Sequence, residues 1–165
     1  MVNMEKITTP RQIEQLAQIA TSIWHEYFPC ILSDEQIDYM VEQFQSQSAI
    51  TAQMEKEGYE YFFIKQGDEV LGYAGVCPKD GKLLLSKFYL KKEHRGHGYA
   101  RQAMDFLVAL CKNRGLCCIW LTVNRMNAHS IQVYQAMGFT IAKSQVADIG
   151  NGFVMDDYIM EKSIQ

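Results

Sequence analysis

The sequence predicts an α/β fold, of the α+β kind, with a twisted and mostly antiparallel sheet of about six or seven strands flanked by helices. Three observations predict it. Apolar residues recur at helical spacing as far as about residue 56. Three aromatic and β-branched runs follow with short polar links, as in antiparallel strands. A glycine turn, a helical stripe and a continuous apolar run come next, as in two parallel strands joined by a helix.

The length and composition favour one domain. The chain has 165 residues, of which 48% are apolar, and this is enough for a hydrophobic core without disulfides or metals. We therefore expect a single domain over residues 1–165. No stretch approaches the roughly 20 apolar residues of a membrane helix, and the N-terminus lacks the layout of a secretory signal. These observations predict a cytoplasmic protein without a membrane partner.

The first third of the chain is expected to be helical. Thr9-Pro10-Arg11-Gln12 has the form of a capping box with proline at the first helical position, which predicts a helix from about Pro10 to His25. Ser33-Asp34-Glu35-Gln36 repeats the capping signal before a second apolar face that ends near Phe44. A shorter helix is expected over residues 49–56, and Gly58 ends this helical part.

Strands are expected next, over residues 59–66, 70–77 and 83–90. After the glycine turn, a helical stripe beginning near Tyr99 ends at Gly115. A buried strand is expected over residues 117–123.

The last part of the chain is expected to hold a helix over residues 128–137 and two strands, over 139–148 and 153–160. Gly150-Asn151-Gly152 between these strands is a hairpin signal.

Five cysteines are present, and Cys117 and Cys118 are adjacent in an apolar run. We interpret these two as buried thiols rather than as disulfide partners.

The turn Arg95-Gly96-His97-Gly98-Tyr99-Ala100 has the features of an anion site. Its glycines leave room for an anion near the backbone, and the N–H groups at the start of the following helix would point at that anion. Residues 87–101 carry five basic side chains and one acidic one, although the whole chain has a net charge of −3. A compact basic patch suits a small polyanion, whereas a nucleic acid would need a broader field. The turn lacks the third glycine of a dinucleotide fold and the Gly-Lys-Ser/Thr ending of a P-loop.

Three features in chain order resemble the GNAT superfamily of acyl-CoA-dependent N-acetyltransferases. Arg95-x-x-Gly98-x-Ala100 matches the pyrophosphate motif of that family, and Val123-Asn124 closes the next strand. Residues Asn127 to Phe139 match the family pattern Asn-x-x-Ala-x-x-x-Tyr-x-x-x-Gly-Phe, with Ser130 as a conservative change at a small packing position. The resemblance implies a GNAT-like sheet in which two parallel strands splay apart to admit acetyl-CoA as cosubstrate.

The resemblance also implies which residues bind this cosubstrate. The backbone N–H groups of residues 96–100 would hold the pyrophosphate, with charge-assisted bonds from Arg95 and Arg101. A β-bulge at the end of the strand would hold the pantetheine and the acetyl group, where the N–H of Tyr89 or Leu90 would stabilise an oxyanion. The full set is Phe88, Tyr89, Leu90, Arg95, Gly96, His97, Gly98, Tyr99, Ala100, Arg101, Asn127 and Tyr134.

Tyr134 is the candidate general acid, because the family places this tyrosine beside the cofactor sulfur. A thiol with a pKa of about 8.5 and a phenol with a pKa of about 10 differ little, so the proton transfer costs only roughly 2 kcal/mol.

The general base has no such assignment. Many family members use a glutamate on the strand before the glycine turn, where this chain has Ser86. His25, Glu26 and Tyr27 follow the first helix, where the family builds its acceptor wall, and they are candidates for the acceptor site together with Ser86. Solvated loop positions are the alternative interpretation. No His/Cys/Asp/Glu grouping has metal-ligand spacing, so no metal is expected.

The acceptor is a primary amine by the same resemblance, attacked directly in a ternary complex. Asp148 to Phe153 and Asp156-Asp157-Tyr158 resemble, more loosely, bacterial members that acetylate polyamines and similar small amines. A polar hairpin without a binding role is equally compatible with these residues. A protein N-terminus or lysine as acceptor, and a non-enzymatic acyl-CoA-binding regulatory module, also remain open. A homodimer is one possible assembly.

Overall fold

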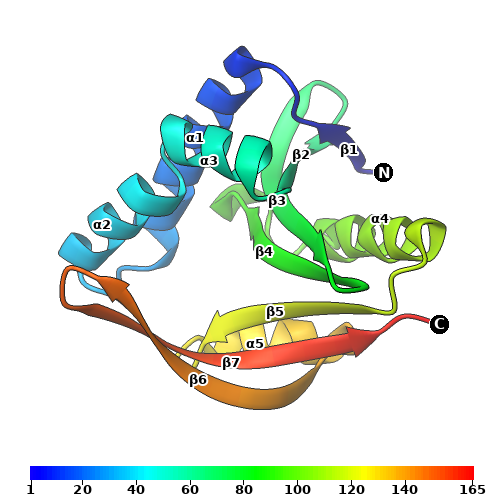
Figure 1. Cartoon of the computed structure of the whole chain (residues 1–165). Helices are drawn as coiled ribbons and strands as arrows, with labels where there is room; N and C mark the ends of the chain where they lie inside the picture. Colours follow the sequence, from blue (N-terminus) through cyan, green and yellow to red (C-terminus); the bar gives the residue numbers. More distant parts are fainter.

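The computed structural model describes residues 1–165, in which seven strands form one sheet in the order β1-β2-β3-β4-β5-β7-β6 (Figure 1). The mixed sheet with flanking helices confirms the predicted fold class. Strands β2 (Glu60–Gln66), β3 (Glu69–Lys79) and β4 (Lys82–Leu90) form the predicted antiparallel meander. Short polar turns join them, because such links leave no room for a crossover helix.

The N-terminal helices are α1 (Pro10–Tyr27), α2 (Asp34–Phe44) and α3 (Gln47–Lys56), close to their predicted bounds. The capping box is present, since the Gln12 N–H donates to Thr9 Oγ1 at 3.2 Å and the Thr9 N–H donates to Gln12 Oε1 at 3.0 Å. Strand β1 (Asn3–Lys6) was not predicted. It is an edge strand held by antiparallel pairing with β2, and four residues are too few to show an alternating pattern.

The single parallel pair positions the site. Strand β4 pairs with β5 (Cys118–Asn124) only through Leu83–Ile119 and Leu84–Trp120, and the two strands then diverge. The prediction of two splayed parallel strands is confirmed. A short 3₁₀ turn (Lys92–His94) and α4 (Tyr99–Arg114) make the crossover between them. Cys118 is buried as predicted, but the prediction is wrong for Cys117, which precedes the strand and is exposed. All five cysteines are free thiols.

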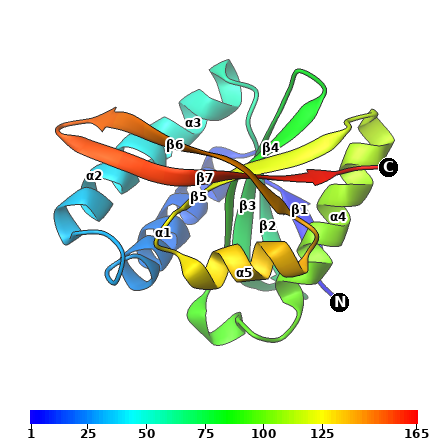
Figure 2. The same ribbon diagram turned by 90° about the horizontal axis from the view of Figure 1, so that it is seen from below.

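The remaining elements are α5 (Ala128–Ala136), β6 (Thr140–Gly150) and β7 (Phe153–Ser163). The predicted hairpin is confirmed, and β7 lies between β5 and β6 in the sheet. Figure 2 shows α5 beneath this part of the sheet and the hairpin tip beside α2. The hydroxyl of Tyr39 on α2 donates to the Ile149 carbonyl at 2.8 Å, and Gln36 Nε2 donates to the Val154 carbonyl at 3.0 Å.

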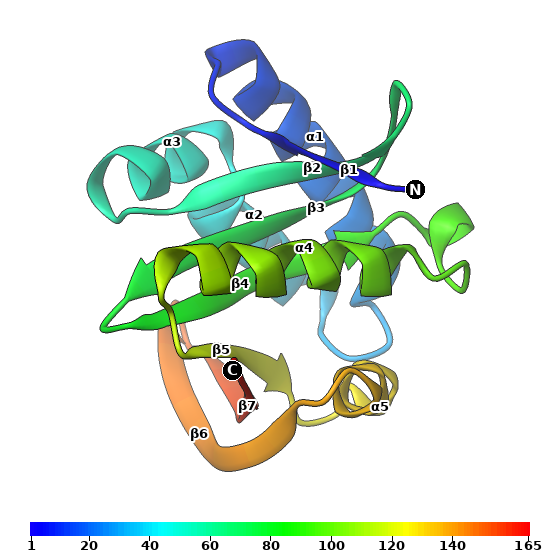
Figure 3. The ribbon, with the colours of Figure 1, turned by 90° about the vertical axis from the view of Figure 1, so that its right-hand side faces the viewer.

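Helices cover both faces of the sheet. Figure 3 shows α4 across one face, with α1 and α2 behind the strands. Because successive side chains of a strand alternate between faces, Tyr61 and Phe63 pack with α1 to α3 whereas Phe62 packs on the α4 side. No helix of the structure is long and apolar enough to span a membrane.

Candidate active site

A cavity of about 680 Å³ opens where β4 and β5 diverge. Its walls include the end of α1, the end of β4, the glycine turn, the start of α5 and the inner face of β7. The residues that these elements contribute to the lining include Trp24, Tyr27, Phe28, Ser86, Lys87, Phe88, Tyr89, Leu90, Arg95, Gly96, Ala100, Asn124, Asn127, Ser130, Tyr134, Met155 and Asp157.

The glycine turn presents free backbone donors to this cavity. Gly96 and Gly98 have φ angles of +80° and +82°, and Gly98 caps α4 without any side-chain hydrogen bond. The first N–H groups of a helix have no partner within it, so those of α4 are available to an anion. A Cβ at either glycine would meet no atom within 4 Å, so the left-handed backbone is what requires glycine here.

Three predicted cofactor residues direct their side chains elsewhere. His97 is exposed, the Tyr99 hydroxyl donates to Gln66 Oε1 at 3.0 Å, and Arg101 reaches the Ala136 carbonyl at 3.4 Å. None of these side chains lines the cavity. At these three positions, only the backbone is available to an anion at the glycine turn.

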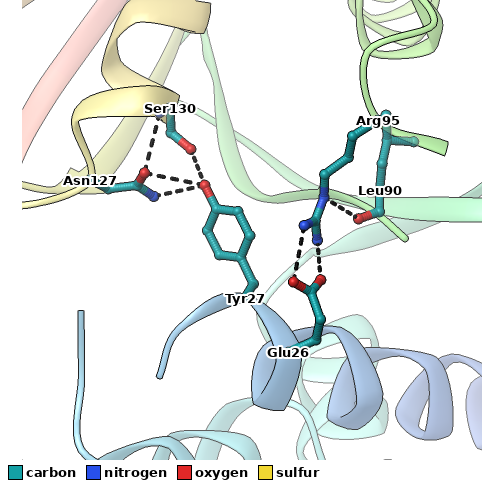
Figure 4. Close-up of polar contacts among 6 residues, drawn as sticks. All are labelled: Glu26, Tyr27, Leu90, Arg95, Asn127 and Ser130. Atoms are coloured by element: carbon teal, nitrogen blue, oxygen red, sulfur yellow. Dashed lines mark hydrogen bonds and ion pairs between the residues drawn. The ribbon is translucent and has the colours of Figure 1, made fainter. Parts of the chain in front are cut away.

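Arg95 is held by the protein itself (Figure 4). Its Nη2 and Nη1 atoms bind the two oxygens of Glu26 at 2.6 and 3.2 Å, and its Nε donates to the Leu90 carbonyl at 3.0 Å. The guanidinium also lies 4.9 Å from the centre of the Tyr27 ring. This bidentate ion pair joins α1 to the end of β4, and the charge-assisted bond of Arg95 to a pyrophosphate stays a prediction.

Tyr27 is tied to the start of α5 (Figure 4). Asn127 Nδ2 donates to the Tyr27 hydroxyl at 3.0 Å, while Asn127 Oδ1 caps α5 by accepting from the Ser130 N–H at 3.2 Å. The Ser130 hydroxyl is hydrogen bonded to the same tyrosine. The sequence interpretation of Ser130 as a packing position is therefore incomplete, because its hydroxyl adds a bond that alanine could not make.

Tyr134 points into the cavity from α5. Its ring lies 5.6 Å from that of Phe139 and 6.5 Å from that of Phe88, and no hydrogen bond to its hydroxyl contributes to its pKa. Burial, and then the charge of Tyr27, raise the pKa of Tyr134 well above its usual range. The hydroxyl is therefore protonated at neutral pH and directed at the cavity.

The β-bulge lies earlier than expected. Lys87 pairs with Gly75 and Leu85 pairs with Val76, so Ser86 is the extra residue of β4. Residues 88–90 instead pair regularly with 72–74. This regular pairing depends on Gly72, where a Cβ would lie 2.0 Å from the Tyr89 carbonyl oxygen.

The bulge places Lys87 beside Ser86. Lys87 Nζ donates to Ser86 Oγ at 2.9 Å and lies 5.9 Å from the centre of the Trp24 ring, and no charged group contributes to its pKa. Burial lowers the pKa of Lys87 to about 8. The sequence analysis counted this lysine in the basic patch of the turn, but the structure places it in the cavity wall opposite α1.

Aromatic rings form the other wall near α1. The Tyr89 ring lies 5.8 Å from that of Trp24, 6.1 Å from that of Tyr27 and 6.0 Å from that of Phe28. His25 is outside this wall. Its Nε2 lies 2.6 Å from Asp38 Oδ1 and its Nδ1 lies 2.8 Å from the Thr21 carbonyl. The hydrogen bond to Asp38 is the main reason why the pKa of His25 is raised.

Asp157 is a buried acid that the sequence linked only loosely to the acceptor, as part of Asp156-Asp157-Tyr158, and to which it gave no individual role. Its side chain lies on the inner face of β7, the residue is 3% exposed, and its Oδ1 has no hydrogen-bond partner. Burial, and then the charge of Asp156, raise the pKa of Asp157 to about 6. Alternation along β7 was the available signal, because residues 155, 157 and 159 share one face of the strand.

Known proteins resemble this chain along its length. Residues 16–139 match the sequence profile of the Acetyltransferase (GNAT) family. A protein of Mycobacterium tuberculosis described as an uncharacterized N-acetyltransferase is 24% identical over 152 residues, covering 92% of this chain and 97% of that protein.

Two solved structures share the fold. The PaiA N-acetyltransferase from Thermoplasma acidophilum, in complex with coenzyme A, has a TM-score of 0.80, 19% identity, and coverage of 99% of each chain. The ribosomal-protein-S18-alanine N-acetyltransferase from Escherichia coli has a TM-score of 0.71, 19% identity, and coverage of 100% of this chain and 95% of that one. The profile match over most of the chain, together with the splayed strands and the glycine turn, establishes that the protein belongs to the GNAT family of acetyltransferases.

Proposed function

We propose that this protein transfers an acetyl group from acetyl-CoA to a primary amine, by direct attack in a ternary complex. The observation that carries the proposal is the cavity between the diverging ends of β4 and β5, with the uncapped N-terminus of α4 at one side and Tyr134 at another. Coenzyme A in the PaiA structure, which shares this fold, supports the same ligand here.

The residues present fit acetyl-CoA. The free N–H groups at the start of α4 suit a pyrophosphate. Acetyl-CoA supplies a thioester whose carbonyl carbon accepts the amine and whose sulfur leaves as a thiol.

The backbone of β4 distinguishes Tyr89 from Leu90 as the oxyanion donor. The Lys91 N–H donates to the Leu71 carbonyl at 2.8 Å. Because alternate residues of an antiparallel strand bond to the same neighbour, Tyr89 bonds toward β3, and the Leu90 N–H points away from it into the gap. We assign the oxyanion contact to Leu90.

Tyr134 is the proton donor to the leaving sulfur in this proposal. The burial that raises its pKa also raises the pKa of a thiol held in the same cavity, so the difference between the two groups stays small. The hydroxyl is free to donate because no hydrogen bond within the chain contributes to its pKa.

A small amine, such as a polyamine, is the acceptor class we favour over a protein. The cavity is lined by side chains of one compact domain, including Ile149 at the hairpin that Tyr39 of α2 holds by a hydrogen bond to the Ile149 carbonyl at 2.8 Å. Aromatic side chains and the buried acid Asp157 suit an ammonium group.

The test is thiol release from acetyl-CoA with a panel of polyamines, diamines, monoamines and peptide N-termini or lysines. We expect turnover with small amines well above the rate without amine. Turnover only with peptides would indicate that the acceptor is an amine of a protein. Binding of acetyl-CoA without turnover on the whole panel would contradict the proposal and favour a regulatory module.

A further inference from the structure

We infer that Asp157 on β7 is the catalytic base of this enzyme, whose carboxylate binds the ammonium group of the acceptor and takes its proton before the attack. This inference rests on the proposed function. It fills the role for which the strand before the glycine turn offers only Ser86.

Asp157 has a buried carboxylate oxygen without a hydrogen-bond partner. Its Oδ1 is the one buried side-chain nitrogen or oxygen of the chain without a partner, and the residue is 3% exposed. Buried polar atoms are almost always hydrogen bonded, and an unmatched carboxylate is among the most costly exceptions. Such a group is explained by a ligand that supplies the missing donor, and an ammonium group supplies donors and the compensating charge.

The second argument is the position of Asp157 in the cavity. Met155, on the same face of β7, packs against the aromatic cluster of α1. Burial first, and then the charges of Tyr134, Tyr27 and Asp157, raise the pKa of Tyr89. Tyr89, Tyr134 and Asp157 all line the cavity, so the proposed acid and the proposed base reach it from different elements, α5 and β7.

The third argument is that the groups facing Asp157 leave it free. The neighbouring acid Asp156 is on the other face of β7, where it binds Arg125 Nε at 3.1 Å. The residues beside Asp157 in the sheet are Asn124 on β5 and Gln145 on β6, which carry no charge. Across the cavity, Lys87 has its own hydrogen bond to Ser86, and neither its pKa nor that of Asp157 is shifted by the other group.

The proton balance is as follows. Asp157 takes one proton from the ammonium group, and the nitrogen lone pair forms a bond to the thioester carbonyl carbon. The carbon–sulfur bond breaks, and the sulfur takes the proton of Tyr134. The second proton lost by the nitrogen restores the Tyr134 hydroxyl, and Asp157 returns its proton to solvent. The sum is one amide, one thiol and one released proton.

The acceptor class follows from the shape and charge of this half of the cavity. The rings of Trp24, Tyr27, Phe28 and Tyr89 line the same cavity as Asp157, and aromatic faces attract an alkylammonium group. Lys87 Nζ faces these rings, 5.9 Å from the centre of the Trp24 ring, and disfavours a second positive charge next to it. The expected acceptor is an alkylamine whose other charged groups, if it has any, lie several carbons from the reacting nitrogen.

The experiment compares Asp157→Asn with the matched control Asp156→Asn, which changes the neighbouring acid on the opposite face. At pH 8, above the pKa of Asp157, we expect Asp157→Asn to lower kcat/KM by roughly 10²-fold or more, as loss of a general base does, while Asp156→Asn retains the wild-type value. Wild-type kcat/KM should rise with pH through an apparent pKa of about 6, and this limb should be absent in Asp157→Asn. Coenzyme A affinity, measured by calorimetry, should be the same in all three proteins.

A second measurement does not depend on turnover. Carboxyl-detected NMR titration should give Asp157 a pKa near 6, which falls when a saturating amine is added, because the ammonium group favours the carboxylate. An unchanged kcat/KM in Asp157→Asn would overturn the inference and leave the proposed function intact. A rise of kcat/KM with an apparent pKa near 8 that disappears in Lys87→Met would also overturn the inference, because it would identify Lys87 as the base. Absence of turnover in the wild type with all amines would contradict the proposed function instead.

Discussion

At the scale of single residues, the site combines groups that the fold holds rigidly with groups that it leaves free. Arg95 and Tyr27 are fully engaged, the first by Glu26 and the second by Asn127 and Ser130. No hydrogen bond contributes to the pKa of Tyr134, and Asp157 Oδ1 has no hydrogen-bond partner. The engaged residues set the walls of the cavity, and the unengaged ones face its interior.

Tyr134→Phe tests the general acid. The ring remains to pack against Phe88 and Phe139, so we expect the fold and coenzyme A affinity to be retained. Turnover at saturating substrates should fall roughly 10²-fold or more, because the leaving sulfur no longer receives a proton. Steady-state thiol release measures it, and an unaltered turnover would exclude this role for the hydroxyl.

Asp157→Asn has an expected effect on stability as well as on activity. Its pKa is raised from 3.8 to about 6, so the folded state binds the proton more tightly than the unfolded state does. The stability that this contributes is fully present below pH 3.8 and is lost as the pH rises through about 6. The asparagine variant avoids the cost of an ionised buried carboxylate. It should be more stable than the wild type by on the order of 1 kcal/mol at pH 8, and the difference should vanish below pH 4.

Urea denaturation at pH 4 and pH 8 measures this difference. If Asp157 had only a structural role, its substitution would lower the free energy of unfolding. If it is a base held in an unfavourable environment for its chemistry, its substitution raises the free energy of unfolding. Lower stability of Asp157→Asn at pH 8 would therefore contradict the proposed role.

At the scale of elements, sequence signals located helices better than the details of strands. Caps at Thr9 and Ser33 gave both helix starts correctly because a cap is a local interaction. Strand β1 and the bulge at Ser86 were missed, since both depend on the neighbouring strand. Gly72 illustrates the same limit, because only the approach of the Tyr89 carbonyl makes glycine necessary there.

Gly98→Asp tests the turn before α4 as the pyrophosphate site. A carboxylate there would repel an anion at the N-terminus of the helix, so we expect coenzyme A binding to be abolished in titration calorimetry. The matched control is Gly67→Asp in the β2–β3 turn, which has a φ angle of +60° and lies outside the cavity. Both variants carry the same kind of backbone strain, so a loss of binding in both would indicate misfolding instead.

At the scale of the whole molecule, the cavity joins two halves of the chain. The α1 to α3 layer meets the second half through the Glu26–Arg95 ion pair, the Tyr27–Asn127 hydrogen bond and the contacts of α2 with the β6–β7 hairpin. A ligand in the cavity would contact elements from both halves, and its binding should therefore stabilise the fold as one unit.

Coenzyme A should raise the melting temperature for this reason. At a ligand concentration of about 100 times its Kd, binding adds about 2.7 kcal/mol. For a chain of this length that corresponds to about 5 to 10 °C in differential scanning calorimetry. Adenosine alone, which lacks the pyrophosphate, serves as the control and should give little shift. No shift with coenzyme A would contradict the assignment of the cavity.

The sequence by itself determined the order of the elements after β1, the glycine turn and the family motif from Asn127 to Phe139, because these are local patterns of capping, periodicity and backbone conformation. Only the tertiary structure decided how the charges are used. Glu26 forms an ion pair with Arg95, which is 69 residues away in the sequence, and Tyr27 is hydrogen bonded to Asn127, which is 100 residues away. The bulge in β4 lets the side chains of the adjacent residues Ser86 and Lys87 contact each other in the cavity wall. Asp157 became a candidate base in the same way, because burial and missing partners are properties of the packed sheet and not of a sequence pattern.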